Sequence, residues 1–387
     1  MSGDAGRPSA LIYVQHLLGV GHLARIARIA RALRDDGVRT IVVRGGMPLA
    51  AFDVPGVETI QLDPVRANPA ALSQLIGADG TLFDEARLAR RRDDLLRHVG
   101  RLRPDLLLIE AFPFGRRAMR FELVPLLEQA RSLGVRIIAA SVRDILQENR
   151  KPGRAEEAAE LIMRRFDLVL VHGEETLTPL GATFPLADRI SGKTVYTGLV
   201  APELPPEPIC EHDVIVSVGG GAVGGPLVGA ALAASGLGQW AATRWLVLAG
   251  PNMADASFDA FTARCPPNVD LRRFVPDLPA RLSGARLSIS QAGYNTVADI
   301  LVARCASVLV PFEGDGETEQ VTRARLLSER GAAVMVREAA LSADVLGEAC
   351  ARAITLARQS CPHALDGAKR TAEILLRALA ADKNRAK

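Results

Sequence analysis

Short apolar runs alternate along the chain with longer segments of helical periodicity, and this alternation constrains the fold more than any other feature. The apolar run 10–14 is followed by a turn, Gly19-Val20-Gly21-His22, and then by a segment over 23–34 with its apolar residues on one face. A second apolar run at 40–43 completes the strand, turn, helix and strand of a parallel α/β unit. Further strands are expected at 105–109, 135–140, 167–171 and 194–197, and helices at 82–100, 120–133 and 154–165.

The alternation stops at a proline-rich segment, 201–212, and then starts again. Strands are expected at 213–218, 245–249, 269–274, 287–290, 307–311 and 332–336, and helices at 226–235, 293–303 and 318–330. With 387 residues, the chain is too long for one ordinary domain. We predict two Rossmann-like domains whose parallel sheets face each other across a cleft, which is the default binding site of such a protein. The predicted parts are an N-terminal domain at 1–200, a linker at 201–212, a C-terminal domain at 213–365, and a helix at 366–387 that could pack back on the N-terminal domain.

Charge and cysteine content narrow the functional classes. The net charge of +3 is too small to indicate a nucleic-acid partner. The five cysteines are scattered and no pair has the spacing of metal ligands, which indicates a reducing compartment rather than a disulfide framework. No apolar stretch approaches the ~20 residues that span a bilayer, and the first residues lack the basic start of a signal peptide. We therefore expect a soluble cytoplasmic protein.

A glycine-rich loop joins the first expected strand and helix of the second half. Five of the eight residues from Val218 to Gly225 are glycine, and no Walker lysine follows them. Backbone N–H groups of such a loop can approach an anion closely, and the start of the next helix adds partial positive charge. A phosphate cradle is favoured over a plain tight turn, because so much flexibility is costly unless it is used. The residues expected to take part are Gly219, Gly220, Gly221 and Ala222.

Two further strand ends in the second half carry polar residues. After the strand at 287–290 come Gly293, Asn295, Thr296 and Asp299, at a turn and on the first turns of a helix. Asp299 could accept hydrogen bonds from a ribose diol, or could simply favour the positive end of the helix. The acidic loop before Glu319 and Gln320 could bind a metal ion, but its glycines and the adjacent helix favour recognition of hydroxyl groups.

The first half holds the candidates for a general base. His22 would lie at the start of a helix, where a lowered pKa keeps the ring neutral and able to accept a proton, or it could simply cap the helix. Glu110 would end a buried strand, on the side of an α/β sheet where ligands bind. Alternatively, Glu110 could be a structural carboxylate paired with Arg116 or Arg117.

Arginines follow two strand ends of this half. Arg116, Arg117 and Arg120 could hold an acidic or phosphate-bearing acceptor, or could equally lie on the surface. Arg143 and Asp144 follow the next strand in the same way and are the third choice for the base.

Four segments, in this order, resemble the glycosyltransferases of the GT-B fold: the turn at 19–22, the glycine loop, the stretch 288–299 and the loop 311–320. The resemblance is to the branch related to the peptidoglycan lipid-intermediate N-acetylglucosaminyl transferase, family 28, and is nearly continuous from about 213 to 336. Bacterial predicted glycosyltransferases resemble the chain more closely, since they share the opening YVQHLLGVGHLAR and the stretch from Glu110 to Arg117. The implied fold is GT-B, with two Rossmann-like α/β domains.

The resemblance assigns residues of the second half to a nucleotide-sugar donor. It implies that the loop 219–225 faces the diphosphate and that Phe274 and Val275 lie against the base, which would be uracil. Asp299 matches a ribose-binding acid that is usually Glu in the family.

The sugar and acceptor sides are implied less completely. Glu319 and Gln320 match a Gln-Gln pair that contacts the donor sugar, and because only the second Gln is kept, the sugar could differ from N-acetylglucosamine. His22 matches a position on the acceptor or catalytic side.

Together these roles imply a metal-independent, inverting glycosyltransferase that moves a sugar from a UDP-linked donor to an acceptor hydroxyl. The glycine loop would stabilise the charge of the leaving diphosphate, so that no metal or other cofactor is expected. A nucleotide-sugar 2-epimerase and a non-catalytic nucleotide-sugar-binding subunit are the alternatives. The acceptor (a glycan, a lipid-linked sugar or a small molecule), the oligomeric state and a peripheral contact with the inner face of the membrane are left open.

Overall fold

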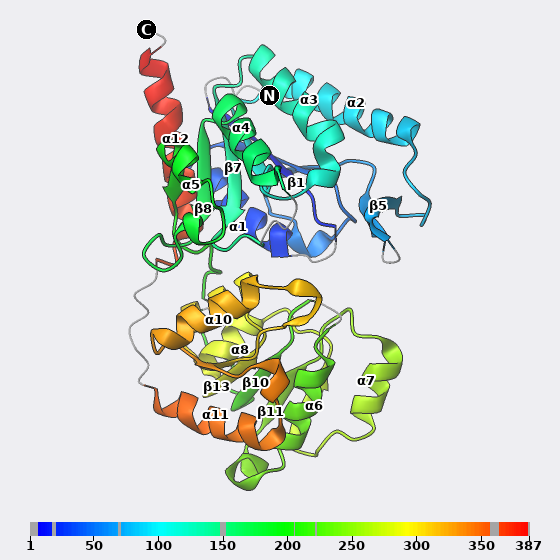
Figure 1. Cartoon of the computed structure of the whole chain (residues 1–387), viewed down its shortest axis with the longest axis vertical. Helices are drawn as coiled ribbons and strands as arrows, with labels where there is room; N and C mark the ends of the chain where they lie inside the picture. The colour runs from blue at the N-terminus through cyan, green and yellow to red at the C-terminus, as the bar shows by residue number, and fades with distance from the viewer. Residues whose placement is uncertain are drawn as a thin grey trace. The chain divides into compact units, whose positions relative to one another are not determined.

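The computed structural model describes residues 7–17, 21–68, 71–147, 152–204, 206–220, 223–356 and 364–385. The chain forms two units. One consists of residues 1–200 together with 366–387, and the other of residues 201–365. Each unit has a parallel sheet of its own (Figure 1). Each also has its own buried hydrophobic residues.

The N-terminal unit is built on a seven-stranded sheet with the order β3-β2-β1-β6-β7-β8-β9. All of its neighbouring strands are parallel. Its inner strands are apolar on both faces, as a parallel sheet covered by helices requires. The strands are β1 (Ser9–Val14), β2 (Arg39–Arg44), β3 (Glu58–Gln61), β6 (Leu106–Glu110), β7 (Ile137–Arg143), β8 (Leu168–His172) and β9 (Thr194–Tyr196).

Helices cover both faces of this sheet. One face packs against α2 (Glu85–Leu102), α3 (Arg120–Ser132) and α4 (Arg154–Arg165). The other packs against α1 (Gly21–Asp35) and α12 (Gly367–Arg385), the last helix of the chain, drawn in red in Figure 1. Arg136, just before β7, holds α12 through an ion pair with Asp382, at 2.9 Å from Nε to Oδ2. The end of the chain is therefore part of the N-terminal unit.

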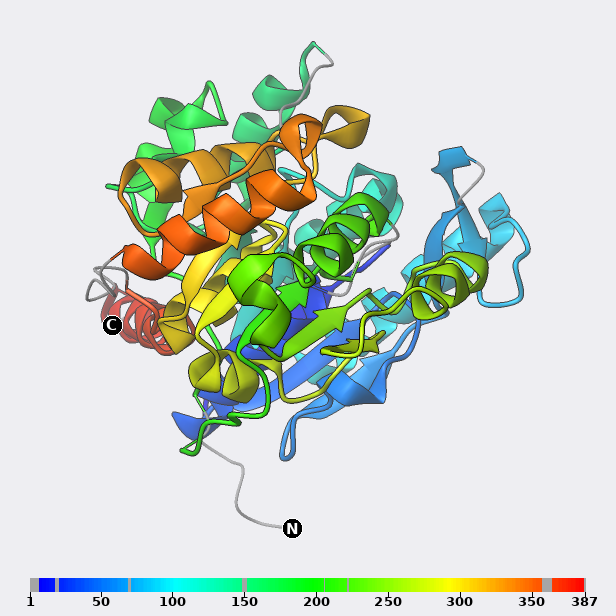
Figure 2. The ribbon, with the colours of Figure 1, turned by 90° about the horizontal axis from the view of Figure 1, so that it is seen from below.

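The C-terminal unit has a six-stranded parallel sheet with the order β12-β11-β10-β13-β14-β15. On one face α6 (Gly225–Ala234) and α11 (Ala343–Thr355) lie side by side (Figure 2) and share a core with the strands. The strands are β10 (Val214–Ser217), β11 (Trp245–Leu248), β12 (Val269–Arg272), β13 (Leu287–Ser290), β14 (Ala306–Leu309) and β15 (Val334–Met335). The other helices are α7 (Asp255–Thr262), α8 (Leu278–Gly284), α9 (Tyr294–Ala303) and α10 (Glu319–Glu329).

Each sheet has a point at which the order of its strands reverses. In the N-terminal unit the chain runs from β1 outward to β2 and β3 and then returns to β6, on the other side of β1. In the C-terminal unit it runs from β10 to β11 and β12 and returns to β13, on the other side of β10. In open α/β sheets ligands bind beyond the carboxyl ends of the strands at such a point. The fold thus marks β1/β6 and β10/β13 as the places to look for sites.

The predicted strands and helices are present, with corrections at their ends and some omissions. The strand predicted at 269–274 ends at Arg272, because its only partner, β11, stops at Leu248. The strand predicted at 332–336 is reduced to Val334–Met335, because it pairs with β14 alone. The sequence analysis missed β3, α7, α8, the short α5 (Ala187–Ile190) and an antiparallel hairpin of β4 (Val65–Asn68) and β5 (Ala71–Gly77).

Candidate functional site

His22 and Glu110 meet at the switch point of the N-terminal sheet. His22 is the second residue of α1, which follows β1, and Glu110 is the last residue of the neighbouring strand β6. The Nδ1 atom of His22 lies 2.8 Å from Oε1 of Glu110. Glu110 is fully buried, whereas 16% of the His22 side chain is exposed. The two residues that the sequence offered as alternative bases therefore form one hydrogen-bonded pair.

Arg25, one turn along α1 from His22, fixes the ionisation of this pair. Its guanidinium forms a buried ion pair with Glu110. Burial alone would raise the pKa of Glu110, but the charge of Arg25 and the hydrogen bonds from His22 and Ser141 hold that pKa well below its usual range. Because Glu110 is ionised, it accepts a hydrogen bond from Nδ1–H of His22, and the ring carries its lone pair on Nε2. No hydrogen bond from Nε2 to the described part of the chain is found.

The His22 ring is neutral at physiological pH. Burial lowers the pKa of His22 to about 3, with a further lowering by the charge of Arg116 and an opposing effect of Glu110. The ring nitrogen bonds to a carboxylate, and in the described ranges it makes no bond to a backbone N–H of α1. The geometry therefore favours a base over a helix cap.

Two buried residues beyond Glu110 were missed by the sequence analysis. Oε2 of Glu110 accepts a hydrogen bond from Oγ of Ser141 on β7 over 2.6 Å, and Ser141 Oγ lies 2.8 Å from Nε2 of His172 on β8. Arg25 was missed as well. Its signal was present, since it lies three residues after His22 on the same face of a helix. His172 also gave a signal, because it ends a strand as Glu110 does.

The pairing of Glu110 with Arg117 that the sequence offered as an alternative is wrong, while the charge of Glu110 does act on Arg116. Arg117 forms an ion pair with Glu157 on α4, and so does Arg120. The partner of Glu110 is Arg25, which comes from α1 and lies far from it in sequence. Because Arg117 and Arg120 already have a carboxylate partner, they are less suited to an acidic acceptor than the sequence alone suggested.

Arg116 and Asp144, which follow β6 and β7, occupy different environments. Arg116 donates through Nε to the carbonyl oxygen of Gln15 over 2.6 Å. Burial lowers the pKa of Arg116 to about 10, with the charges of Glu110 and Arg143 acting in opposite directions, so that it stays charged at neutral pH. Asp144 is buried, and its carboxylate accepts the N–H of the following residue at 2.9 Å. This burial favours a structural role for Asp144 over that of a base.

The glycine loop of the C-terminal unit runs from β10 into α6. Gly219 has a φ of +71°, in the left-handed region that favours glycine. The side chain of Asn252, which follows β11, donates to the carbonyl oxygen of Gly220 over 2.5 Å. A Cβ atom on Gly224 would lie 2.2 Å from Cβ of Val218, so only glycine fits there. Four residues of the predicted loops lie outside the described ranges: Gly19, Val20, Gly221 and Ala222.

Two helix N-termini meet at the switch point of the C-terminal sheet. The helix α6 follows β10, and α9 follows the neighbouring strand β13, with Gly293 as its N-cap. Asn295 and Thr296 lie in the first turn of α9, and Asp299 lies in its second turn and is half-buried. Two positive helix ends side by side make an environment that favours a diphosphate.

Glu319 and Gln320 are held differently from each other. Glu319 is 3% exposed and pairs with Arg323 over 2.9 Å. Oε1 of Gln320 accepts the N–H groups of Ala292 (3.0 Å) and Phe312 (3.3 Å), and so ties together the loops after β13 and β14. Gln320 can still offer its amide N–H groups to a ligand, whereas the burial of Glu319 favours a structural role.

Phe274 and Val275 face opposite ways. Phe274 is 65% exposed, while Val275 is 3% exposed. A ring exposed to that degree can stack on a flat ligand, whereas Val275 can offer only its backbone groups. Both residues follow β12, at the carboxyl end of the sheet.

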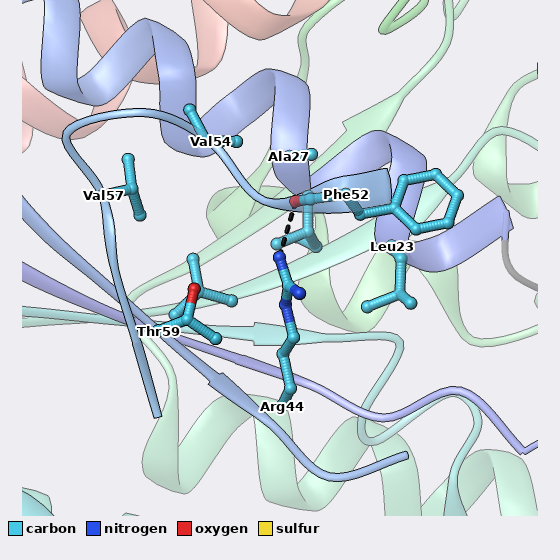
Figure 3. A pocket seen from close by; sticks show the side chains of 9 residues that line it. Leu23, Ala27, Arg44, Phe52, Val54, Val57 and Thr59 are labelled. Atoms are coloured by element: carbon cyan, nitrogen blue, oxygen red, sulfur yellow. Dashed lines mark hydrogen bonds between the residues drawn. The ribbon is translucent and has the colours of Figure 1, made fainter. Parts of the chain in front are cut away.

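A small pocket in the N-terminal unit lies between α1 and the strands β2 and β3 (Figure 3). Its lining is largely aliphatic, and its one charged residue, Arg44, donates to the carbonyl oxygen of Phe52 over 2.5 Å and to Asp53 over 2.6 Å. Because the guanidinium is engaged by the loop beside it, we interpret this pocket as a packing gap.

The described residues offer neither a metal site nor a membrane-spanning helix. Among the described residues, no group of three or more His, Cys, Asp and Glu side chains is placed to hold a metal ion. Within the same ranges, no helix combines the length and the apolar character needed to cross a membrane.

Two successive Rossmann-like units in one chain, each with polar residues at the switch point of its sheet, are the architecture of the GT-B fold. Residues 215–369 match the glycosyltransferase family 28 C-terminal domain. The chain is thus a GT-B protein related to family 28, as the sequence resemblance predicted.

Relatives and solved structures agree with this assignment. The chain is 40% identical over 77 residues to UDP-N-acetylglucosamine--N-acetylmuramyl-(pentapeptide) pyrophosphoryl-undecaprenol N-acetylglucosamine transferase of Anaeromyxobacter sp. (strain K), a match that covers 20% of this chain and 20% of that protein. The same enzyme of Exiguobacterium sibiricum is 37% identical over 89 residues, or 23% of this chain and 24% of that protein. MurG of Acinetobacter baumannii has the same fold, with a TM-score of 0.61 and 17% identity over 96% of this chain and 100% of that one. The forosaminyltransferase SpnP does so with a TM-score of 0.63 and 15% identity over 97% and 100%.

Proposed function

We propose that the protein is a glycosyltransferase that moves a sugar from a nucleoside-diphosphate sugar to an acceptor hydroxyl group. One observation carries the proposal. A neutral histidine, oriented by a buried carboxylate, lies at the switch point of a unit that shares its chain with a family 28 domain. The N-terminal unit supplies the base, and the C-terminal unit holds the donor.

His22 is the proposed general base. Its Nε2 atom removes the proton of the acceptor hydroxyl while that oxygen attacks the anomeric carbon of the donor. The bond from the anomeric carbon to the diphosphate oxygen breaks, and the nucleoside diphosphate leaves with the electron pair. The ring becomes an imidazolium, which the charge of Glu110 stabilises. Attack from the side opposite the leaving group gives inversion.

The leaving group is proposed to lie at the N-termini of α6 and α9. Backbone N–H groups there, together with the glycine loop, stabilise the charge that develops on the diphosphate, because they are already oriented before the reaction. This arrangement supports a reaction without a metal ion. Turnover that survives EDTA supports this part of the proposal, and turnover that EDTA abolishes and Mg²⁺ restores contradicts it.

The donor is proposed to carry UDP. The curated relatives are named for transfer from UDP-N-acetylglucosamine, although the matching segment covers 20% of the Anaeromyxobacter protein. Phe274 would stack on the base, Asp299 would accept hydrogen bonds from the ribose, and Gln320 would contact the sugar. A solved glycosyltransferase of the same fold, VinC, binds dTDP (TM-score 0.57, 15% identity), so both nucleotides belong in the test.

The experiment is a panel of UDP-, GDP- and dTDP-sugars incubated with the purified full-length chain. Glycan, lipid-linked and small-molecule hydroxyl compounds serve as acceptors. Formation of a glycosylated acceptor together with nucleoside diphosphate supports the transferase. A changed sugar without net release of diphosphate indicates a 2-epimerase, and binding without turnover across the panel indicates a nucleotide-sugar-binding subunit. Either of these two results would overturn the proposal.

A further inference from the structure

We propose that Ser141 and His172 are positioning residues for the His22–Glu110 pair, which they hold through a chain of hydrogen bonds across the sheet. The inference rests on the proposed function, since it concerns the orientation of the proposed base. It is argued from four buried polar side chains at or near the carboxyl ends of four adjacent strands.

The four residues form a continuous row. Glu110 ends β6, Ser141 is its paired residue on β7, His172 ends β8, and Thr197 follows β9. All four are fully buried. Oε2 of Glu110 lies 2.6 Å from Ser141 Oγ, which is 2.8 Å from Nε2 of His172, and Nδ1 of His172 is 2.9 Å from Oγ1 of Thr197. A row of polar groups in a sheet otherwise filled with apolar side chains is costly unless every group is bonded.

The donors in this row point in one direction. Burial lowers the pKa of His172 to about 3, so the ring is neutral and carries a single N–H. If that N–H were on Nδ1, Ser141 would have to donate to Nε2, and Oε2 of the buried Glu110 would lose its hydrogen bond. The N–H therefore lies on Nε2. His172 donates to Ser141, and Ser141 donates to Glu110. Oγ1 of Thr197 lies against the lone pair on Nδ1 of His172 and also bonds to the carbonyl oxygen of Gly198 over 2.9 Å.

This direction determines what the row does for His22. Oε1 of Glu110 accepts from His22 and Arg25, while Oε2 accepts from Ser141. With both oxygens held, the carboxylate cannot rotate, and Nδ1–H of His22 has one fixed acceptor. The ring is thereby kept in the tautomer with its lone pair on Nε2. No proton needs to move along the row, since His172 stays neutral.

A matched pair of isosteric variants tests the row against plain structural packing. Thr197→Val removes the hydroxyl that bonds to Nδ1 of His172 and to the carbonyl oxygen of Gly198. Thr40→Val removes a hydroxyl that is also buried in the same sheet, on β2, but bonds to the carbonyl oxygen of Val38 over 3.1 Å, outside the row. If the row positions the base, Thr197→Val lowers kcat while Thr40→Val does not, even where both lower the melting temperature.

His172 offers a test by rescue. His172→Leu is expected to lower kcat about 10-fold or more, the size typical of losing a hydrogen bond that orients a functional side chain, with the Kd for UDP unchanged. His172→Gln keeps an N–H near the position of Nε2 and is expected to recover most of that loss. Equal kcat values for the two variants would overturn the proposal.

A measurement without turnover separates this proposal from the proposed function. Imidazole ¹⁵N shifts in the full-length protein are expected to show His22 with its N–H on Nδ1 in the wild type and as a tautomer mixture in Ser141→Ala. An unchanged tautomer in folded Ser141→Ala contradicts the row, whatever the activity.

If His22→Ala keeps full turnover, the base assignment fails. If His22→Ala is inactive while Ser141→Ala and His172→Leu keep the wild-type kcat, the positioning proposal alone fails.

Discussion

Nδ1 of His22 lies 2.8 Å from Oε1 of Glu110, although 88 positions separate the two residues in the chain. This contact makes His22→Ala the first variant to test. We expect turnover to fall by roughly 10²–10⁴-fold, the usual contribution of a general base, while the Kd for UDP stays the same. Initial rates and calorimetry with UDP measure the two quantities. Wild-type turnover with a true acceptor would show that His22 is not the base.

Glu110→Gln is expected to lower the stability of the protein. The amide keeps the size of the side chain but removes the charge that Arg25 faces in a fully buried environment. Removing one partner of a buried ion pair typically costs about 3–5 kcal/mol, and we expect a loss of that order in the free energy of unfolding. Urea denaturation measures it. Arg117→Gln is the control, because its ion pair with Glu157 is partly exposed and should contribute at most ~1 kcal/mol.

The pH profile should lack the ordinary histidine step. Burial and the charge of Arg116 lower the pKa of His22 to about 3 in the free protein, so the ring stays neutral as the pH falls through the usual histidine range. The kcat/KM for the acceptor reports ionisations of the free enzyme, and we expect no decrease from His22 between about pH 8 and about pH 5. Arg116→Met should raise the pKa of His22 and move its decline to higher pH. A wild-type profile that falls with an apparent pKa near the ordinary histidine value, about 6.5, would contradict this assignment.

Two adjacent glycines allow a controlled test of the phosphate loop. A Cβ on Gly224 would collide with Val218, whereas a Cβ on Gly225 would meet nothing within 4 Å. Gly224→Ala is therefore expected to displace the loop and weaken UDP binding, and Gly225→Ala to leave it nearly unchanged. Calorimetry with UDP on both variants, with circular dichroism as a check of folding, decides the matter. Equal affinities would show that the shape of this loop does not matter for the donor.

Asp299 tests the ribose contact. Hydrogen bonds to charged groups contribute about 1.5–3 kcal/mol, so Asp299→Ala should weaken UDP binding by roughly 10- to 100-fold. Asp299→Asn keeps one acceptor oxygen and should lose less. Comparing UDP with 2′-deoxy-UDP gives the control, because the preference for UDP should disappear in Asp299→Ala. If the preference persists, another residue reads the ribose.

The fold could be predicted from sequence because its signals are local. Apolar runs, helical periodicity and glycine turns each lie within about ten residues, and the glycine loop and Gly293 were found for the same reason. The row from Glu110 to Thr197 could not be predicted, because it exists only when β6, β7, β8 and β9 lie in that order. Glu319 and Arg323 have the i,i+4 spacing of an ion pair on a helix, which was a local signal. The resemblance instead assigned Glu319 to a pair that contacts the donor sugar, so the ion pair was not predicted.

The return of α12 to the N-terminal unit has a consequence for protein engineering. Residues 201–365 form a cassette that is inserted between two segments of one folded body, residues 1–200 and 366–387. A chimera made by a single cut in the proline-rich segment would place a foreign α12 against α1 and Arg136 of the native N-terminal unit. A chimera designed to exchange donor specificity should therefore have the whole cassette replaced, with both junctions cut and the native C-terminal helix left in place.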